Sequence, residues 1–171
     1  MKTPSFTGEE LQPYVEFLLN QFRRTDGFWF LGVENTYGYD AAIRMNEEVW
    51  HRMGKMMTRE IKERFSMNER GLKALAKVLR YFPWAIISGY EIEVKEEEVI
   101  VTVPHCPSQE ARLTRGLGEY ACKDMHFGEF RSIIEEIDPD IAVECLFAPP
   151  DPHPKELFCK WRFTMNKDTI G

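Results

Sequence analysis

The segment AIISGYEIEVKEEEVIVTVP, residues 85–104, marks the point at which the apolar pattern of the chain changes. Its two apolar runs flank the acidic segment 95–98, and Val99, Val101 and Val103 alternate with other residues in the second run. A period of two places these valines on one face of a strand. Two such runs around a short polar segment predict a β-hairpin.

On the N-terminal side of the hairpin, apolar residues recur at helical spacing. Residues 7–10, TGEE, fit a capping box, and we expect the regular part of a first helix to begin near Gln12. Asp26 and Gly27 form a helix-stop signal at its expected end. The apolar run 28–33 that follows is compatible with either a strand or a buried helical turn.

Two further helices are expected before the hairpin. The longest helix of the chain should cover about 39–65, with its apolar residues along one stripe. A shorter helix, capped by Asn68, should cover about 69–81, and Pro83 should end it.

The second half of the chain predicts a mixture of helices and strands. Short helices are expected at about 108–117 and 126–137, and strands at 141–147 and 157–165. This order predicts an α+β fold in which a helical N-terminal half packs on a mainly antiparallel four-stranded sheet. We expect residues 1–171 to form a single domain, with a helical half over about 1–82 and a cysteine-bearing half over about 83–171.

Composition excludes several classes of partner. The net charge is -6 over 171 residues, whereas nucleic-acid-binding domains usually carry a basic patch, so no nucleic-acid partner is expected. No apolar stretch is long enough for a membrane span, and residues 1–10 lack the apolar core of a signal peptide. We therefore expect a cytoplasmic protein with no membrane partner.

All four cysteines lie in the second half of the chain, at Cys106, Cys122, Cys145 and Cys159. Disulfides are rare in the cytosol, so these residues are expected to be thiols or metal ligands. Four thiolates at one point would suit zinc or an iron–sulfur cluster. The intervening segments are long and no C-x-x-C pair is present, which also leaves each cysteine open to being a small buried apolar residue.

A second hypothesis is a cysteine-dependent hydrolase of a small metabolite that contains sulfur or nitrogen. Cys106 directly precedes an expected helix, and a helix N-terminus lowers a thiol pKa. Cys106 would then be the nucleophile, with His105 or His153 as the base. Arg112 would bind a substrate carboxylate, which matches the geometry of its guanidinium group.

A third hypothesis is a non-enzymatic module that binds a small molecule or a partner protein. The helical half could provide a homodimer face, or an apolar pocket around Trp29, Met45, Trp50 and Met53. Glu34 follows a strongly apolar run, and we weigh two interpretations of it. The favoured one is an acid near a helix start, stabilised by the helix dipole. The other is a partly buried carboxylate, which would be either paired or functional.

Three segments of the chain resemble a little-characterised prokaryotic family, found in archaea and anaerobic bacteria and classified as a domain of unknown function. They are DGFWFLGVENTYGYDAAIRMNEEVW (26–50), CPSQEARLTRGLGEYACK (106–123) and IDPDIAVECLFAPPDPHPKELFCKWRF (137–163). The cysteine-bearing half is also distantly similar to L-2-amino-thiazoline-4-carboxylic acid hydrolases, which open a sulfur–nitrogen ring. The resemblance implies that the four thiols act together, and we rank the metal site first and the hydrolase second.

Overall fold

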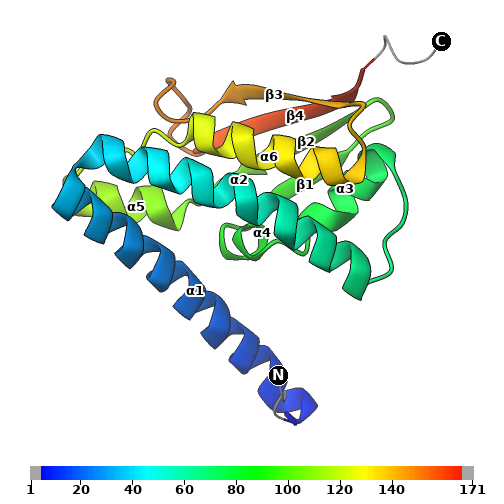
Figure 1. Cartoon of the computed structure of the whole chain (residues 1–171), viewed down its shortest axis with the longest axis horizontal. Helices are drawn as coiled ribbons and strands as arrows, with labels where there is room; N and C mark the ends of the chain where they lie inside the picture. The colour runs from blue at the N-terminus through cyan, green and yellow to red at the C-terminus, as the bar shows by residue number, and fades with distance from the viewer. Residues whose placement is uncertain (1–4, 167–171) are drawn as a thin grey trace.

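The computed structural model of the protein describes residues 5–166 (Figure 1). In chain order the elements are α1 (Gly8–Tyr37), α2 (Tyr39–Arg64), α3 (Gly71–Leu79), α4 (Pro83–Ile87), β1 (Glu91–Val94), β2 (Glu98–Val103), α5 (Pro107–Thr114), α6 (Lys123–Ile137), β3 (Ile141–Phe147) and β4 (Cys159–Met165). The fold is α+β, as the sequence predicts. The first four residues of the segment inspected for a signal peptide, and residues 167–171 of the expected domain, lie outside the described part.

The four strands form one antiparallel sheet in the order β1-β2-β4-β3. The predicted hairpin is present as β1 and β2, in which Val94 pairs with Val99. Its first strand is shorter than expected, because residues 85–87 belong to α4. Pro83 occupies the first turn of that helix, where its missing N–H has no helical partner to lose.

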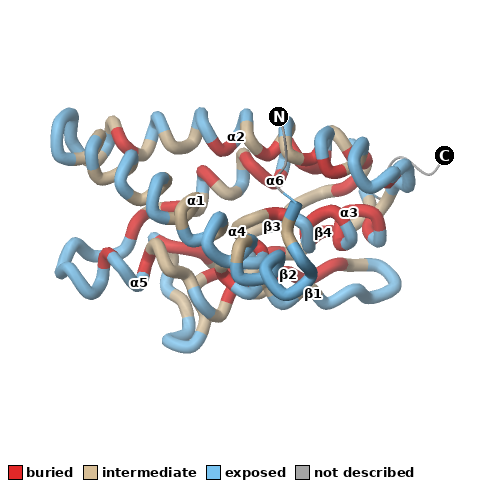
Figure 2. The backbone as a smooth tube through the Cα atoms, turned by 90° about the horizontal axis from the view of Figure 1, so that it is seen from below, coloured by how far each residue is buried: buried red, intermediate tan, exposed pale blue. Residues whose placement is uncertain are grey.

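One face of the sheet carries the core. Val99, Val101, Trp161 and Phe163 are fully buried on it. The ring of Phe130, from α6, meets the rings of Trp161 and Phe163 edge-on, with centroids 5.1 and 5.2 Å apart. Figure 2 shows that the buried backbone follows α3, α6 and the central strands. Helices α3 and α6 therefore cover the sheet, and α2 packs on the far side of α6.

Helices α2 and α6 approach each other closely at Gly54. A Cβ atom on Gly54 would lie 2.4 Å from Ser132 Oγ and 2.9 Å from the Glu129 carbonyl oxygen. Both distances are below normal contact, so only glycine allows this separation of the helices. The contact fixes the middle of α6 against α2.

The first helix corrects two expectations. The capping box is confirmed, since the Thr7 amide donates to Glu10 Oε2 at 3.0 Å, but α1 begins at once at Gly8. It also continues through Asp26 and Gly27 and ends only at Gly38, whose φ of 89° is outside the helical range. The run 28–33 is thus helical, and α1 is four residues longer than α2 (30 against 26), which was expected to be the longest.

The expected cap at Asn68 is also wrong. Helix α3 begins at Gly71, with Arg70 in the N-cap position. The guanidinium of this N-cap residue binds Asp138, 68 positions away in the sequence, at 2.9 Å. A contact over that separation leaves no local signal for the start of α3 at Gly71 rather than at Glu69. Among the described residues, none of the helices is both long and apolar enough to cross a lipid bilayer.

Candidate functional site

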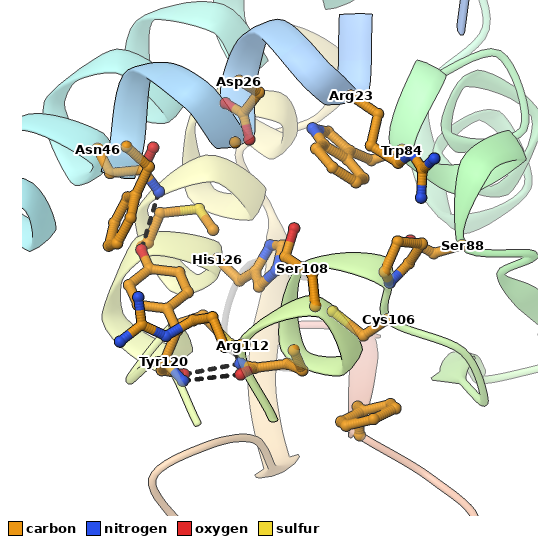
Figure 3. A pocket seen from close by; sticks show the side chains of 18 of the residues that line it. Arg23, Asp26, Asn46, Trp84, Ser88, Cys106, Ser108, Arg112, Tyr120 and His126 are labelled. Carbon is orange, nitrogen blue, oxygen red and sulfur yellow. Dashed lines mark hydrogen bonds between the residues drawn. The ribbon is translucent and has the colours of Figure 1, made fainter. Parts of the chain in front are cut away.

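A cavity of about 350 Å³ lies where α1, α2, α4, α5 and the start of α6 meet (Figure 3). Its walls are mainly apolar and include the aromatic side chains of Phe30, Trp50, Trp84, Tyr90 and Tyr120. Four of these rings meet edge-on in two pairs, Trp50 with Trp84 at a centroid distance of 6.1 Å and Phe30 with Tyr120 at 4.9 Å. Its size and lining are typical of a site for a small organic molecule.

Gln109 holds one wall of the cavity in place. Its side chain is fully buried, donates to the Tyr120 carbonyl oxygen at 2.7 Å and accepts from the Tyr120 amide at 2.7 Å. The Tyr120 hydroxyl in turn accepts from the Asn46 side chain at 2.8 Å, as Figure 3 shows. The side-chain amide of Gln109 therefore satisfies both backbone groups of Tyr120, as a neighbouring strand would, and fixes the segment after α5.

Arg112, from α5, is bound to Glu34, from α1. Arg112 Nη1 lies 2.6 Å from Glu34 Oε2, and Nη2 lies 3.1 Å from Oε1. The guanidinium also lies over the rings of Tyr39 and Phe30. Glu34 is therefore paired, which was the less favoured of the two interpretations of its position in the sequence, and a substrate carboxylate would have to displace it to reach Arg112.

His126 and Glu129 form a buried pair on the first turns of α6. His126 Nδ1 lies 3.0 Å from Glu129 Oε2, and both side chains are largely enclosed. In the tautomer that donates from Nδ1 to the Glu129 carboxylate, Nε2 is an acceptor. No described residue forms a hydrogen bond with Nε2, and Figure 3 shows the ring directed into the cavity.

Asp26, from α1, faces the same cavity. Burial raises the pKa of Asp26 to about 6, against the effect of a hydrogen bond from Trp50, and repulsion by Glu129 adds to the increase. Within residues 5–166, Asp26 forms no ion pair with a lysine, arginine or histidine. Among the described residues the Asp26 carboxylate therefore has no directly paired cation, although Arg23, Arg24 and Arg115 also line the cavity.

Three of the four cysteines line this cavity: Cys106, Cys122 and Cys159. The fourth, Cys145, does not, although its strand neighbours that of Cys159 as expected. Three of the four predicted thiols therefore border one cavity, and their convergence on a single shared site stays a prediction. Burial raises the pKa of Cys159 to about 12 and that of Cys122 well above its ordinary value.

Cys106 occupies the N-cap position of α5, as the sequence indicated. Burial nevertheless raises the pKa of Cys106 to about 11, and this effect outweighs the amides of Gln109 and Ser108, which favour the thiolate. At neutral pH the thiol is protonated. This is the opposite of the lowered pKa that a nucleophilic cysteine needs.

The predicted metal site has no support from side-chain arrangement. In the described part of the chain, no group of three or more His, Cys, Asp or Glu side chains is placed to hold a metal ion. All four thiols are free. A zinc or iron–sulfur site built from Cys106, Cys122, Cys145 and Cys159 stays a prediction.

The two histidines predicted as bases lie outside the cavity, whereas Arg112 lines it. His105 is exposed and lies 3.7 Å from Glu110, and His153 Nε2 lies 3.0 Å from Glu119. Neither histidine lines the cavity that Cys106 faces. Of the residues expected to form an apolar pocket, only Trp50 lines the cavity, whereas Trp29 and Met45 are exposed.

Three residues of the cavity were not among the sequence-based candidates: Asp26, His126 and Glu129. The segment HFGE at 126–129 contains a usable signal, because residues three apart share one face of a helix. Nothing in the local sequence indicates that Asp26 lines a cavity, because Asp26 and Gly27 together resemble the end of a helix.

Comparison with known proteins places nearly the whole chain in one family. The sequence pattern of DUF6125, a family of unknown function, matches residues 7–165. No curated protein matches the chain.

Proposed function

The chain belongs to the DUF6125 family of unknown function, and we propose that it binds a small organic molecule with a positively charged nitrogen in the cavity between α1 and α6. The observation that carries this proposal is the unpaired carboxylate of Asp26 inside an aromatic cavity. The proposal refines the third hypothesis from the sequence, a ligand-binding module, and moves its site.

Electrostatics favour a cation over an anion at this position. Ionised Asp26 is costly to bury without a partner, and Glu129 lies near enough to repel it. Of the arginines that line the cavity, the buried Arg112 is already neutralised by Glu34, and Arg23, Arg24 and Arg115 form no ion pair with Asp26 within residues 5–166. A ligand cation would remove the cost at Asp26, whereas an anion would add to it.

The aromatic walls favour the same class of ligand. The faces of tryptophan and tyrosine rings attract cations, most strongly where water is excluded. Trp50 and Trp84 both line the cavity, and Trp50 interacts with Asp26 as well. An ammonium or amidinium group beside Asp26 would therefore meet both a carboxylate and an aromatic surface, and the apolar part of the ligand would fill the remaining volume.

His126 would give this site acid–base chemistry. Nε2 would accept a proton from a bound substrate, and Glu129 would stabilise the resulting imidazolium through Nδ1. A histidine oriented by a carboxylate and facing an enclosed cavity supports this role. If the protein is an enzyme, His126 replaces His105 and His153 as the proposed base.

A thermal-shift comparison tests the ligand class. Benzylamine and benzyltrimethylammonium should raise the melting temperature of the protein, whereas benzyl alcohol and benzoate, which share the ring, should do so much less. Asp26→Asn should lose the response to the cations, and Glu47→Gln, on α2 outside the cavity, should keep it. Stabilisation by benzoate in preference to the cations would refute the proposal.

Thiol chemistry is a second candidate, favoured by the three cysteines in the cavity walls. In a hydrolase, Cys106 would have to transfer its proton to a base such as His126 before attacking a substrate. In a metal protein, anaerobically purified material would contain stoichiometric zinc or iron, and Cys122→Ser would lose it. Metal-free protein would remove the second of these possibilities.

We also propose a cytoplasmic location and no nucleic-acid partner. Four free thiols are compatible with a reducing compartment, and the net charge of -6 disfavours contact with phosphates. Cell fractionation and a nucleic-acid retention assay at low salt would test the two statements separately.

A further inference from the structure

The N-terminal half of α1 projects beyond the rest of the molecule (Figure 1). None of the residues of α1 is buried, although the helix has 30 residues. Leu11, Val15 and Leu18 are about half exposed, and their spacing of four and three places them on one stripe. A stripe of this kind is normally covered, because helices gain most of their stability from packing an apolar face.

The same stripe is covered where α1 reaches the domain. Phe22 lies four residues beyond Leu18, and its ring packs on Trp50 and Trp84, with centroids 6.1 and 6.2 Å away. The face of α1 that packs on its own domain at Phe22 thus continues into solvent at Leu18, Val15 and Leu11. The rest of the molecule does not extend far enough along α1 to cover Leu18, Val15 and Leu11.

In this half of α1 the acidic residues, Glu9, Glu10 and Glu16, all precede the basic residues, Arg23 and Arg24. Glu9 and Glu10 lie in the first turn, and Arg23 and Arg24 lie about four turns later. Neither Glu9 nor Arg24 takes part in an ion pair within residues 5–166. The N-terminal half of α1 is therefore acidic toward its start and basic toward its end.

We infer that the arm, defined as residues 8–24, pairs with the arm of a second copy of this chain in antiparallel orientation. Two copies related by a two-fold axis between residues 16 and 17 bring Glu9 opposite Arg24. The same alignment places Val15 opposite Leu18. It also brings Leu11 next to Phe22, whose ring already packs on Trp50 and Trp84 of its own copy. One register therefore matches the charges and the apolar stripe together, whereas a parallel pair would place like charges side by side.

This pairing would place the dimer interface next to the cavity of each copy. Arg23 and Arg24 border the cavity as well as the basic end of the arm, so the second copy would lie near each cavity entrance. The inference does not depend on the ligand proposed above, because it rests on the arm alone.

Sedimentation velocity over micromolar protein concentrations tests the pairing. The wild-type chain should be a dimer, and Leu18→Asp should raise the dissociation constant at least about tenfold, because both copies lose an apolar contact. Val49→Asp is the matched control, since Val49 is an equally exposed apolar residue on α2. It should leave the dimer unchanged.

A charge exchange tests the orientation. Glu9→Arg alone and Arg24→Glu alone should each weaken the dimer, and the two together should restore it, because the opposite charges then face each other in reverse. A monomer at every concentration, a dimer insensitive to Leu18→Asp, or a double variant weaker than either single variant would overturn the inference. A monomer that binds lipid vesicles through Leu18 would overturn it too.

Discussion

The Arg112 guanidinium binds the Glu34 carboxylate through both of its terminal nitrogens, at 2.6 and 3.1 Å. The two residues are 78 positions apart in the sequence and join α5 to α1. Both side chains are largely enclosed, with 9% and 17% of their surface exposed. The pair holds two walls of the cavity together, and it also occupies the arginine that would otherwise attract an anionic ligand.

Removing one member of this pair should destabilise the protein strongly. Arg112→Met leaves Glu34 enclosed without a partner, and we expect the free energy of unfolding to fall by about 3–5 kcal/mol. The double variant Arg112→Met/Glu34→Leu should recover much of that loss. Urea denaturation of both variants gives the comparison.

The control for that experiment is Arg162→Met. Arg162 binds Glu144 on the open face of the sheet, where both side chains are about half exposed, and its loss should change the free energy of unfolding by less than about 1 kcal/mol. Equal losses for Arg112→Met and Arg162→Met would contradict a structural role for the enclosed pair.

The contact of α2 with α6 predicts a specific intolerance at Gly54. Gly54→Ala forces a Cβ atom against Ser132 Oγ and the Glu129 backbone, and we expect it to cost about 1–3 kcal/mol of stability. Gly32→Ala in α1, where nothing lies within 4 Å of the added atom, should be neutral or stabilising. Thermal unfolding that ranks the two variants in the reverse order would show that the helices are not this close.

Asp26 predicts a dependence of stability on pH. The folded-state pKa of about 6 is above the ordinary value of 3.8, so the folded protein favours the protonated acid. The contribution of Asp26 to stability is therefore largest below pH 3.8 and is lost as the pH rises through 6, with a total loss of up to about 3 kcal/mol from this residue. Asp26→Asn should therefore stabilise the protein near neutral pH and have little effect in mild acid.

Chemical denaturation at several pH values measures this difference. Asp124→Asn, which changes an exposed residue at the start of α6, should show no comparable gain at neutral pH. If Asp26→Asn were the less stable protein near neutral pH, Asp26 would be making a favourable interaction that the structure does not contain.

The thiols should react slowly at neutral pH. With a pKa of about 11, against an ordinary value of 9.0, Cys106 has about 100-fold less thiolate than a free cysteine. Its rate of alkylation by iodoacetamide should be lower by about that factor and should rise tenfold per pH unit. Mass spectrometry of the modified peptides follows each cysteine separately. Fast modification of Cys106 at neutral pH would favour the cysteine hydrolase instead.

The elements that the sequence predicted well are those with local signals. The alternation of Val99, Val101 and Val103 predicted the buried face of β2, and TGEE predicted the capping box of α1. The predicted end of α1 at Asp26 and Gly27 was wrong, because the helix beyond that point is held by residues distant in the sequence. Phe30 packs on Tyr120, and Glu34 binds Arg112.

The candidate site shows the same division. Cys106 could be placed near a helix start because that feature is local, and its burial could not be predicted because five helices contribute to it. Asp26 resembled a helix stop in the sequence and became a cavity residue only through the continuation of α1 past it. A pairing of His126 with Glu129 could have been predicted from their spacing, but their exposure to a cavity could not.

The affinity of benzyltrimethylammonium at different pH values tests the central claim most directly, because this cation has a fixed charge. In isothermal titration calorimetry, its dissociation constant should rise about tenfold from near pH 7.5 to near pH 5, as Asp26 takes up a proton. Asp26→Asn should bind weakly at both pH values. Undiminished binding by that variant, or no binding of aromatic cations to the wild-type protein, would contradict the claim.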